Sequence, residues 1–411
     1  MHGTGGRRFH RKQCSTKFKA PDPVCTGQVD DGFIEKYKPS TFKPHLPNAW
    51  DRSRHNHTPP SISSNFFLMF EVMKIVDLRS DTVTKPTPAM LDAMIKAPLG
   101  DDVFNEDPTV NALQEFAADM FGMEAALFCS SGTQTNQIAI KLHTQPGDEV
   151  ICDALSHIYL YEGGGIAFNS GASVRLLNGH FGRFTVEDVR NNINDDNVHF
   201  PSTRLVSIEN TVNKGGGACW HFDELKAIQN VCKEHHLAFH MDGARLFNAM
   251  IAKNENPKQY GQLFDIISIC LSKGLGAPVG SLLLGSKEHI YKARRIRKVL
   301  GGGMRQAGLL AAAGLYALQN HIERLSEDHH KAQMIAHTLK SCEWVKEIYP
   351  VETNIVIFRM HDKTPSSQLL QHLEQNGFKA VGMGTQLIRF VFHLDQSVED
   401  IERLSACLGR F

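Results

Sequence analysis

Short apolar runs alternate with helical patterns from about residue 109 to residue 284, and this alternation constrains the fold more than any other feature. Alternation of strands and helices at this spacing predicts a mostly parallel sheet covered by helices on both faces. The expected strands are Ala125–Cys129, Glu149–Cys152, Ser173–Leu177, Arg204–Glu209, Ala238–Asp242, Ile266–Leu271 and Ser281–Leu284. The helical periods include Thr109–Phe121, Thr133–Leu142, Thr185–Asn194 and Phe222–His235. The expected fold class is therefore α/β.

The pattern changes after a long helix that is expected near Met304–Gln319. The later strand-like segments are Val351–Arg359, Lys379–Gly382 and Leu387–His393, and the later helical periods are Ser366–Asn376 and Val398–Leu408. A chain of 411 residues is long enough for two domains with separate cores. We therefore predict a large α/β domain at residues 73–324 and a small α+β domain at residues 325–411.

The first 72 residues differ from the rest of the chain. They contain seven of the 17 prolines and show no sustained period, so they cannot bury enough apolar surface to offset the entropy of ordering. Their first 20 residues carry six basic side chains and no acid, a composition that is also found in mitochondrial presequences. Glycines and Pro21 disfavour an amphipathic helix there, so we expect a disordered extension and a cytoplasmic location, with a mitochondrial location as the alternative.

The overall composition excludes several classes of function. Basic and acidic residues both number 44, which gives no reason to expect nucleic acid or an acidic membrane surface as a partner. The nine cysteines are dispersed without the spacing of disulfide frameworks or metal sites, so we expect reduced thiols and no metal. No apolar run reaches the length that spans a bilayer, and the chain is expected to be a soluble intracellular protein.

A lysine follows one of the expected strands. The segment DIISICLSKGLGAPVGS ends its apolar run at Ser272 and then places Lys273 before a glycine-rich loop. The lysine is either an ordinary surface residue or a group placed to lose its proton and form a covalent bond. Asp242 ends another expected strand 31 positions earlier, about the length of one helix and one strand. Both side chains are therefore expected at the same edge of the sheet, where Asp242 either serves a ligand or pairs with Arg245.

Other motifs follow the remaining strands. In SSGTQTNQIAIKL, Gly132 and Thr133 start a helix whose N-terminus suits a phosphate, although Thr133 could instead cap its own helix. In DALSHIYLYEGGG, His157 is either a solvated histidine or a ring that stacks on a planar ligand. A phosphate site, a strand-end acid, a stacking ring and a desolvated lysine together describe a site for pyridoxal phosphate. In such a site the lysine forms a Schiff base and the acid keeps the pyridine nitrogen protonated.

Seven motifs resemble those of a known family. They are LRSDTVTKPT, GDDVFNEDPTVNALQ, SSGTQTNQIA, DALSHIYLYEGGG, MDGARLFNA, LSKGLGAPVGS and GGGMRQAG, and their order and content are similar to the low-specificity L-threonine aldolases. The resemblance runs from about Met73 to the C-terminus. It implies the aspartate-aminotransferase-like fold, called fold type I, with pyridoxal 5'-phosphate as cofactor and an amino acid as substrate. It also implies a homo-oligomer, a dimer or tetramer, with active sites at subunit contacts.

The resemblance implies a role for each candidate residue. Lys273 would be the Schiff-base lysine, and Asp242 would hold the pyridine nitrogen. Arg245 would reach the phenolic oxygen near the substrate, and His157 would stack on the ring. The other implied groups are Gly132 and Thr133 at the phosphate, Ser80 and Arg389 at the substrate carboxylate, and Arg305 with Lys298 from a neighbouring subunit. The implied reaction cleaves L-threonine or L-allo-threonine to glycine and acetaldehyde.

One position departs from the family. The family usually carries a histidine near the β-hydroxyl of the substrate, where this chain has Val212 in ENTVN. If position 212 faces the substrate, His157 or a bound water would have to manage the hydroxyl proton. The departure leaves room for a β-eliminating lyase or a racemase on the same scaffold. A catalytically weakened homologue that serves as a binding protein is a third hypothesis. A dehydrogenase-like protein is disfavoured, because no GxGxxG follows the first strand.

Overall fold

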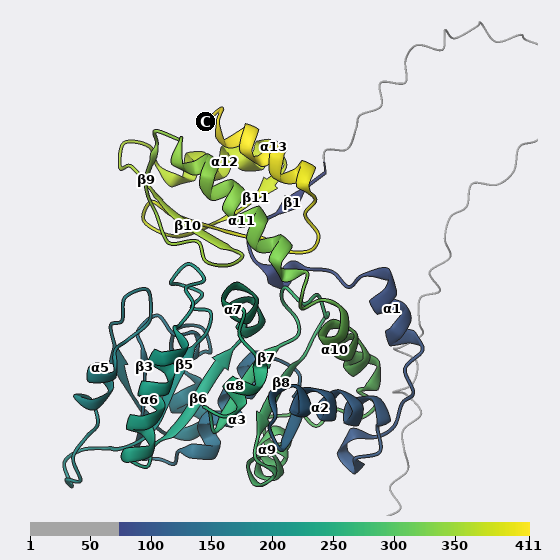
Figure 1. Ribbon diagram of the computed structural model, residues 1–411, viewed down its shortest axis with the longest axis vertical. Coiled ribbons are helices and arrows are strands. Elements are labelled where there is room, and N and C mark those ends of the chain that lie inside the picture. The colour runs from purple at the N-terminus through teal and green to yellow at the C-terminus, as the bar shows by residue number, and fades with distance from the viewer. Residues whose placement is uncertain (1–73) are drawn as a thin grey trace, which may run out of the picture. The chain divides into compact units, whose positions relative to one another are not determined.

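The computed structural model describes residues 74–411, and a seven-stranded sheet between residues 125 and 285 forms the centre of its larger part (Figure 1). The strand order is β2 (Ala125–Cys129), β8 (Ser281–Gly285), β7 (Ile266–Cys270), β6 (Ala238–Gly243), β5 (Ser202–Glu209), β3 (Asp148–Asp153) and β4 (Ser173–Leu177). Strand β8 runs antiparallel to both of its neighbours, and the other six strands share one direction. The mostly parallel sheet is confirmed, and each of the seven strands predicted for it agrees with the structure to within two residues. The later strand predicted at Val351–Arg359 instead begins at Ile355. The predicted extension at residues 1–72 lies outside the described residues.

Helices cover both faces of this sheet, because its strands are apolar on both sides. On β2, Ala126 and Phe128 belong to the core shared with helices α2 and α10, whereas Leu127 and Cys129 belong to the core shared with α3 and α9. The helices are α1 (Pro88–Ile95), α2 (Pro108–Phe121), α3 (Gly132–His143), α4 (His157–Leu160), α5 (Val186–Arg190), α6 (Phe222–Glu234), α7 (Leu246–Lys253), α8 (Pro257–Gly261), α9 (Lys287–Val299) and α10 (Gly308–Asn320). None of the helices within residues 74–411 is long and apolar enough to cross a membrane.

Two helices are shorter than the sequence pattern predicts. Helix α5 begins at a capping box formed by Thr185 and Asp188, but it ends at Arg190 instead of Asn194. The Asn194 side chain donates to Glu149 and to the Pro201 carbonyl, which draws this segment out of the helix. Helix α10 begins at Gly308 and not at Met304, because the Gly308 N–H donates to the Asp107 carboxylate at 2.8 Å.

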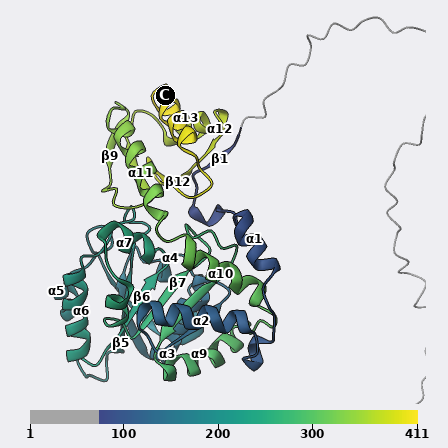
Figure 2. The ribbon, with the colours of Figure 1, turned by 45° about the vertical axis from the view of Figure 1, so that its right-hand side comes forward.

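A second, antiparallel sheet lies in the C-terminal part of the chain (Figure 2). Its order is β12 (Val381–Gly384), β13 (Leu387–Val391), β10 (Ile355–Met360) and β9 (Val345–Ile348). Helices α11 (Leu325–Lys340), α12 (Ser366–Gln375) and α13 (Val398–Leu408) contribute to its core. Val76 and Leu78 join the same core, and β1 (Val76–Asp77) pairs in parallel with β11 (Phe378–Lys379). The segment that precedes α1 is thereby fixed to the C-terminal layer, while the division at residue 325 stays a prediction.

Candidate active site

The carboxyl ends of the parallel strands place five candidate residues at one edge of the large sheet. Glu209 and Asp242 end the adjacent strands β5 and β6 in register with each other. Gly132, His157 and Lys273 lie in the first few residues after β2, β3 and β7. Ligands of doubly wound sheets bind at this edge. The sequence prediction that Asp242 and Lys273 open onto a common edge agrees with the parallel pairing of β6 with β7.

A cavity of about 430 Å³ opens at this edge. Its lining includes five of the predicted site residues: Ser80, His157, Arg245, Lys273 and Arg389. Ser80 comes from the segment before α1, and Arg389 comes from β13 of the second sheet. The cavity therefore brings together residues that are more than 300 positions apart in the sequence.

Lys273 is half-buried in the loop that follows β7. Its Nζ donates to the Cys270 Sγ at 3.2 Å, and its carbonyl accepts the Gly276 N–H at 2.8 Å. Gly276 has a φ of 80°, a conformation that glycine adopts without steric cost. The glycine-rich loop therefore makes the tight turn that holds the lysine at the cavity.

Asp242 is buried below the cavity and has no cation bound to it in the described residues. Its Oδ2 accepts the Asn136 Nδ2 at 2.9 Å, and its Oδ1 accepts the Ala244 N–H at 3.2 Å. The alternative that Asp242 pairs with Arg245 is wrong. The Arg245 guanidinium instead donates to both oxygens of Asp81, at 2.7 Å each. Asp242 is therefore free of an internal ion pair and can serve a ligand.

Asp81 is a buried partner that the sequence motifs did not reveal. Burial alone would raise its pKa, but the nearby Arg245 charge and the hydrogen bonds from that guanidinium lower the pKa to about 2. Asn354 Nδ2 donates to the same carboxylate at 3.4 Å. Because Asp81 directly follows Ser80, the segment that supplies a cavity hydroxyl also fixes Arg245 in place.

His157 is the first residue of α4, and its ring is held from one side. Its Nδ1 lies 3.0 Å from Glu162 Oε1, and its backbone N–H donates to Glu209 Oε2 at 2.7 Å. Burial lowers the pKa of His157, but the hydrogen bond to Glu162 and the nearby Asp242 charge outweigh burial and raise it. Glu209 is itself buried beside Asp242. Its burial raises its pKa, and the negative charge of Asp242 raises it further, to about 7. His157 is thus a fixed ring in an acidic setting, not a solvated loop histidine.

The start of α3 has the features of a phosphate site. Ser131 is the N-cap, because its Oγ accepts the Gln134 N–H at 3.2 Å, so the alternative that Thr133 caps the helix is wrong. Thr133 is exposed in the first turn. A Cβ at Gly132 would lie 2.5 Å from Cys270 Sγ, so only glycine fits against the last residue of β7. A 12-residue helix presents the positive end of its dipole here, which suits an anion.

Arg389 is oriented by two acceptors. Its Nη1 donates to Asn213 Oδ1 at 2.7 Å, and its Nη2 donates to the Arg79 carbonyl at 2.8 Å. Burial, together with the like charge of Arg245, lowers the pKa of Arg389 to about 10. The charge of Arg245 is balanced by Asp81, whereas Arg389, within the described residues, donates only to neutral acceptors, so Arg389 offers the cavity a positive charge that suits a carboxylate. The sequence motifs did not reveal Asn213, which lies one position after the family's histidine.

Val212 does not line the cavity. Its side chain is buried, and its backbone bridges to Ala218. A Cβ at Gly182 would lie only 2.5 Å from Val212 Cγ1, which shows how closely the valine packs on that turn. Position 212 is therefore part of the packing, and Asn213 is its neighbour at the cavity.

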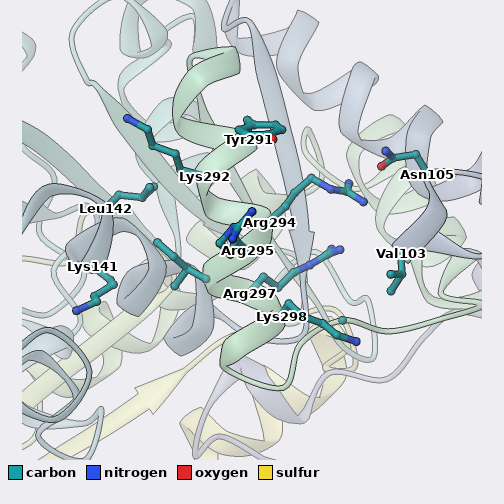
Figure 3. Close-up of a pocket in the computed structure, with 12 residues that line it drawn as sticks. Val103, Asn105, Lys141, Leu142, Tyr291, Lys292, Arg294, Arg295, Arg297 and Lys298 are labelled. Atoms are coloured by element: carbon teal, nitrogen blue, oxygen red, sulfur yellow. The ribbon is translucent and has the colours of Figure 1, made fainter. Parts of the chain in front are cut away.

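Lys298 and Arg305 lie away from the cavity that Lys273 lines. A second cavity of about 670 Å³ is lined by Lys298 and five other basic side chains, most of them on α9 (Figure 3). These five residues are Lys141, Lys292, Arg294, Arg295 and Arg297. Arg305 is exposed and donates to Asp101 Oδ2 at 2.9 Å. The structure of one chain does not bring these two predicted residues into the site.

Comparison with solved structures defines the class of the fold. The chain is similar to a threonine aldolase from Leishmania major, with a TM-score of 0.72 and 24% identity over 81% of this chain and 98% of that one. It is also similar to the serine palmitoyltransferase of Sphingomonas wittichii, with a TM-score of 0.65 and 17% identity over 82% and 86% of the two chains. The fold is fold type I of the pyridoxal-phosphate enzymes, as the sequence predicted.

Sequence comparison then identifies the family. Residues 77–363 match the profile of the Beta-eliminating lyase family. A low-specificity L-threonine aldolase of Escherichia coli K12 is 42% identical over 333 residues, which cover 81% of this chain and 98% of that protein. Low-specificity L-threonine aldolase 1 of Arabidopsis thaliana is 41% identical over 343 residues, or 82% and 96% of the two proteins. The chain belongs to the beta-eliminating lyases and, within them, to the low-specificity L-threonine aldolases.

The fold and the family imply pyridoxal 5'-phosphate, and the residues at the sheet edge fit it. Lys273 supplies an amine, and Asp242 supplies a buried carboxylate without a competing cation among the described residues. The close contact at Gly132 leaves the start of α3 free of side-chain bulk. These three features match the aldehyde, the ring nitrogen and the phosphate of that cofactor.

Proposed function

We propose that the chain is a pyridoxal-phosphate-dependent aldolase that cleaves L-threonine and L-allo-threonine to glycine and acetaldehyde. The observation that carries this proposal is the common cavity of Lys273, Arg245, His157 and Arg389, next to the buried Asp242. A covalent amine, a ring-nitrogen partner and a carboxylate clamp are the three elements that an amino-acid carbon–carbon lyase of this family requires. The relatives named above support the same activity.

The cofactor would be held by residues of three strand ends. Lys273 would bind the aldehyde, Asp242 the ring nitrogen, and Arg245 the phenolic oxygen, while Gly132 and Thr133 would hold the phosphate at the start of α3. When bound, the cofactor accepts the electron pair that remains on Cα after the Cα–Cβ bond breaks.

The substrate would be oriented by its carboxylate. Arg389 is already fixed by Asn213 and the Arg79 carbonyl, so it loses little rotamer freedom when it binds a carboxylate. Ser80 lines the same cavity and supplies a hydroxyl. Holding the carboxylate in one place sets the direction of the Cα–Cβ bond, and such positioning lowers the barrier to cleavage. The β-hydroxyl proton would be removed by His157 or by a bound water.

The site is completed by a neighbouring subunit in this proposal. Lys298 and Arg305 are exposed and lie outside the cavity of their own chain. Lys298 would reach the phosphate site of another copy in a dimer or a tetramer, and Arg305 would do so by exchanging its exposed ion pair with Asp101 for the phosphate. The active sites of the homo-oligomer would then be shared between subunits.

A β-eliminating lyase is the second candidate, because the matching family profile carries that name. Both reactions use the same lysine, acid and carboxylate clamp. Their products differ, since an aldolase releases glycine and an aldehyde whereas a β-eliminating lyase releases a 2-oxo acid and ammonia. Product analysis with L-threonine and L-serine as substrates therefore separates the two functions.

The Lys273→Ala variant tests the proposed function. We expect it to lose both the visible absorbance of the lysine-bound cofactor and nearly all release of acetaldehyde. Lys96→Ala is the matched control, because Lys96 is exposed and, within residues 74–411, pairs only with Asp92 one turn away. An unchanged visible spectrum in the Lys273→Ala variant would exclude Lys273 as the covalent residue. Acetaldehyde release by the purified wild-type protein, measured first, tests the activity itself.

A further inference from the structure

Glu162 holds a buried carboxylate next to the His157 ring. Its side chain has no solvent exposure, whereas the His157 side chain is 34% exposed. Two amides from consecutive residues of α3 donate to it: Asn136 Nδ2 to Oε1 at 2.9 Å and Gln137 Nε2 to Oε2 at 2.7 Å. The third partner is His157 Nδ1, at 3.0 Å from Oε1. Neither the sequence motifs nor the family resemblance singled out Glu162.

The orientation of the Gln137 amide follows from its other contacts. Its Oε1 accepts Asn169 Nδ2 at 3.0 Å, so its NH₂ group is the one that faces Glu162. A Cβ at Gly165 would lie 2.5 Å from the Gln137 Cδ, so the loop after α4 packs directly on this amide. The carboxylate is therefore held by a support that cannot easily turn.

This arrangement fixes the tautomer of His157. An ionised carboxylate only accepts hydrogen bonds, so the ring nitrogen that faces Glu162 must carry a proton. A neutral His157 is then protonated at Nδ1, and Nε2 is the nitrogen with a free lone pair. Because the ring lines the cavity, Nε2 is the ring atom that can accept a proton from a ligand. The same function is performed by carboxylates that orient histidines in other enzyme sites.

The network also reaches Asp242. Asn136 Nδ2 donates both to Glu162 Oε1 and to Asp242 Oδ2, each at 2.9 Å. The Asn136 amide therefore lies between two carboxylates: Glu162, which contacts His157, and Asp242, which is proposed to bind the ring nitrogen. The sites for the cofactor ring and for the histidine that would stack on it are set by a single side chain of α3.

We propose that Glu162 is a positioning residue, which acts through His157 by holding Nδ1–H and leaving Nε2 as the proton acceptor at the cavity. The kinetic part of this inference rests on the proposed function, whereas the state of the imidazole does not. The charged and titratable groups around His157 are Glu162 from the loop after α4, Asp242 on β6 and Glu209 on β5. The Tyr161 ring lies 5.6 Å from the His157 ring, and Lys214 lies over Tyr161.

The test compares Glu162→Gln with Glu187→Gln, an exposed glutamate on α5, in the full-length enzyme loaded with pyridoxal 5'-phosphate. The glutamine keeps the shape of Glu162 but removes the charge. We expect the pKa of His157, followed by NMR of the histidine side chains and assigned with His157→Asn, to fall in Glu162→Gln and to stay unchanged in Glu187→Gln. An unchanged His157 titration in Glu162→Gln overturns the inference, whether or not the enzyme cleaves threonine.

Kinetics provide the second readout. We expect kcat for L-threonine to fall about 10- to 100-fold in Glu162→Gln, as is typical for the loss of a group that orients a histidine. KM should change little, because Arg389 and Ser80 are untouched. In the His157→Asn background, Glu162→Gln should have no further effect, since the two residues act as one unit. Losses that multiply in the double variant would show that Glu162 acts independently of His157. Absence of threonine cleavage by the wild type would instead reject the proposed function and leave the NMR result valid.

Discussion

Replacing Asp81 by asparagine removes the partner of a buried arginine. In the wild type, the Arg245 guanidinium donates two hydrogen bonds of 2.7 Å to the Asp81 carboxylate, and both side chains are almost fully buried. Asparagine has nearly the same shape but no charge. Arg245 would then remain as a buried cation without a counter-ion, because Asp242 has its own donors. The change therefore tests the ion pair and leaves the packing nearly intact.

The size of the effect follows from the burial of the pair. Removing one partner of a buried ion pair costs about 3–5 kcal/mol. The pKa of Asp81 also indicates that its charged form stabilises the folded protein. Its lowering from 3.8 to about 2 corresponds to about 2 kcal/mol of folding stability at neutral pH. The described part of the chain has roughly 340 residues, for which the entropy of unfolding is about 0.7 kcal/mol per kelvin. A loss of about 3–5 kcal/mol in folding stability therefore lowers Tm by about 4–7 °C.

Calorimetry of wild type and Asp81→Asn measures this shift. Asp92→Asn is the matched control, because its ion pair with Lys96 is exposed, and it should lower Tm by less than about 1 °C. The carboxylate of Asp81 has a lowered pKa, so its contribution is present above pH 4 and is lost as the pH falls toward 2. The gap in Tm between wild type and variant should therefore stay constant between pH 7 and pH 5. A shift as small as that of the control would refute the reasoning, and so would a gap that closes within this range.

Two further predictions concern ligand binding. Arg389→Ala should raise KM for L-threonine about 10- to 100-fold, because a charge-assisted bond to the carboxylate is worth about 1.5–3 kcal/mol, and steady-state kinetics with wild-type values would remove Arg389 from the site. Gly132→Ala should weaken binding of pyridoxal 5'-phosphate, because its Cβ would meet the Cys270 sulfur at 2.5 Å. Equilibrium dialysis measures this loss, and adding Cys270→Ala should recover part of the affinity; no recovery would show that the contact is not the cause.

The strands of the large sheet could be predicted because both of its faces are covered. Residues such as Leu127 and Phe128 face opposite cores, so each strand is a continuous apolar run that is visible in the sequence. The chemistry at the strand ends followed from the same pattern, since Asp242 lies near the end of β6 and Lys273 follows the end of the neighbouring parallel strand β7. The predicted end of helix α5 was wrong, because Asn194 donates a hydrogen bond to Glu149, 45 positions earlier. The local sequence period carries no information about such a long-range bond.

The partners of the site residues could not be predicted, because they are distant in the sequence. Asp81 lies 164 positions from Arg245, and no motif links the two segments. Asp242, only three positions away, was the obvious candidate. It lies near the end of β6, however, whereas Arg245 is the N-cap of α7, so the two side chains separate. Glu162 was hidden for the same reason, since its amide donors lie 25 and 26 positions before it on α3.

Val212 is packed inside the fold and does not line the cavity. Gly182 has a φ of 79° and no Cβ, and the Val212 side chain occupies the space that a Cβ would need. Val212 therefore lies against this turn, and its isopropyl group offers neither a proton donor nor a proton acceptor. Recognition of the β-hydroxyl in this chain must therefore come from polar groups that line the cavity. Among them, His157 would present Nε2 as the proton acceptor in the arrangement proposed above, because Glu162 would hold the Nδ1 proton. The preference between threo and allo substrates should accordingly depend on the position of the His157 ring and not on residue 212.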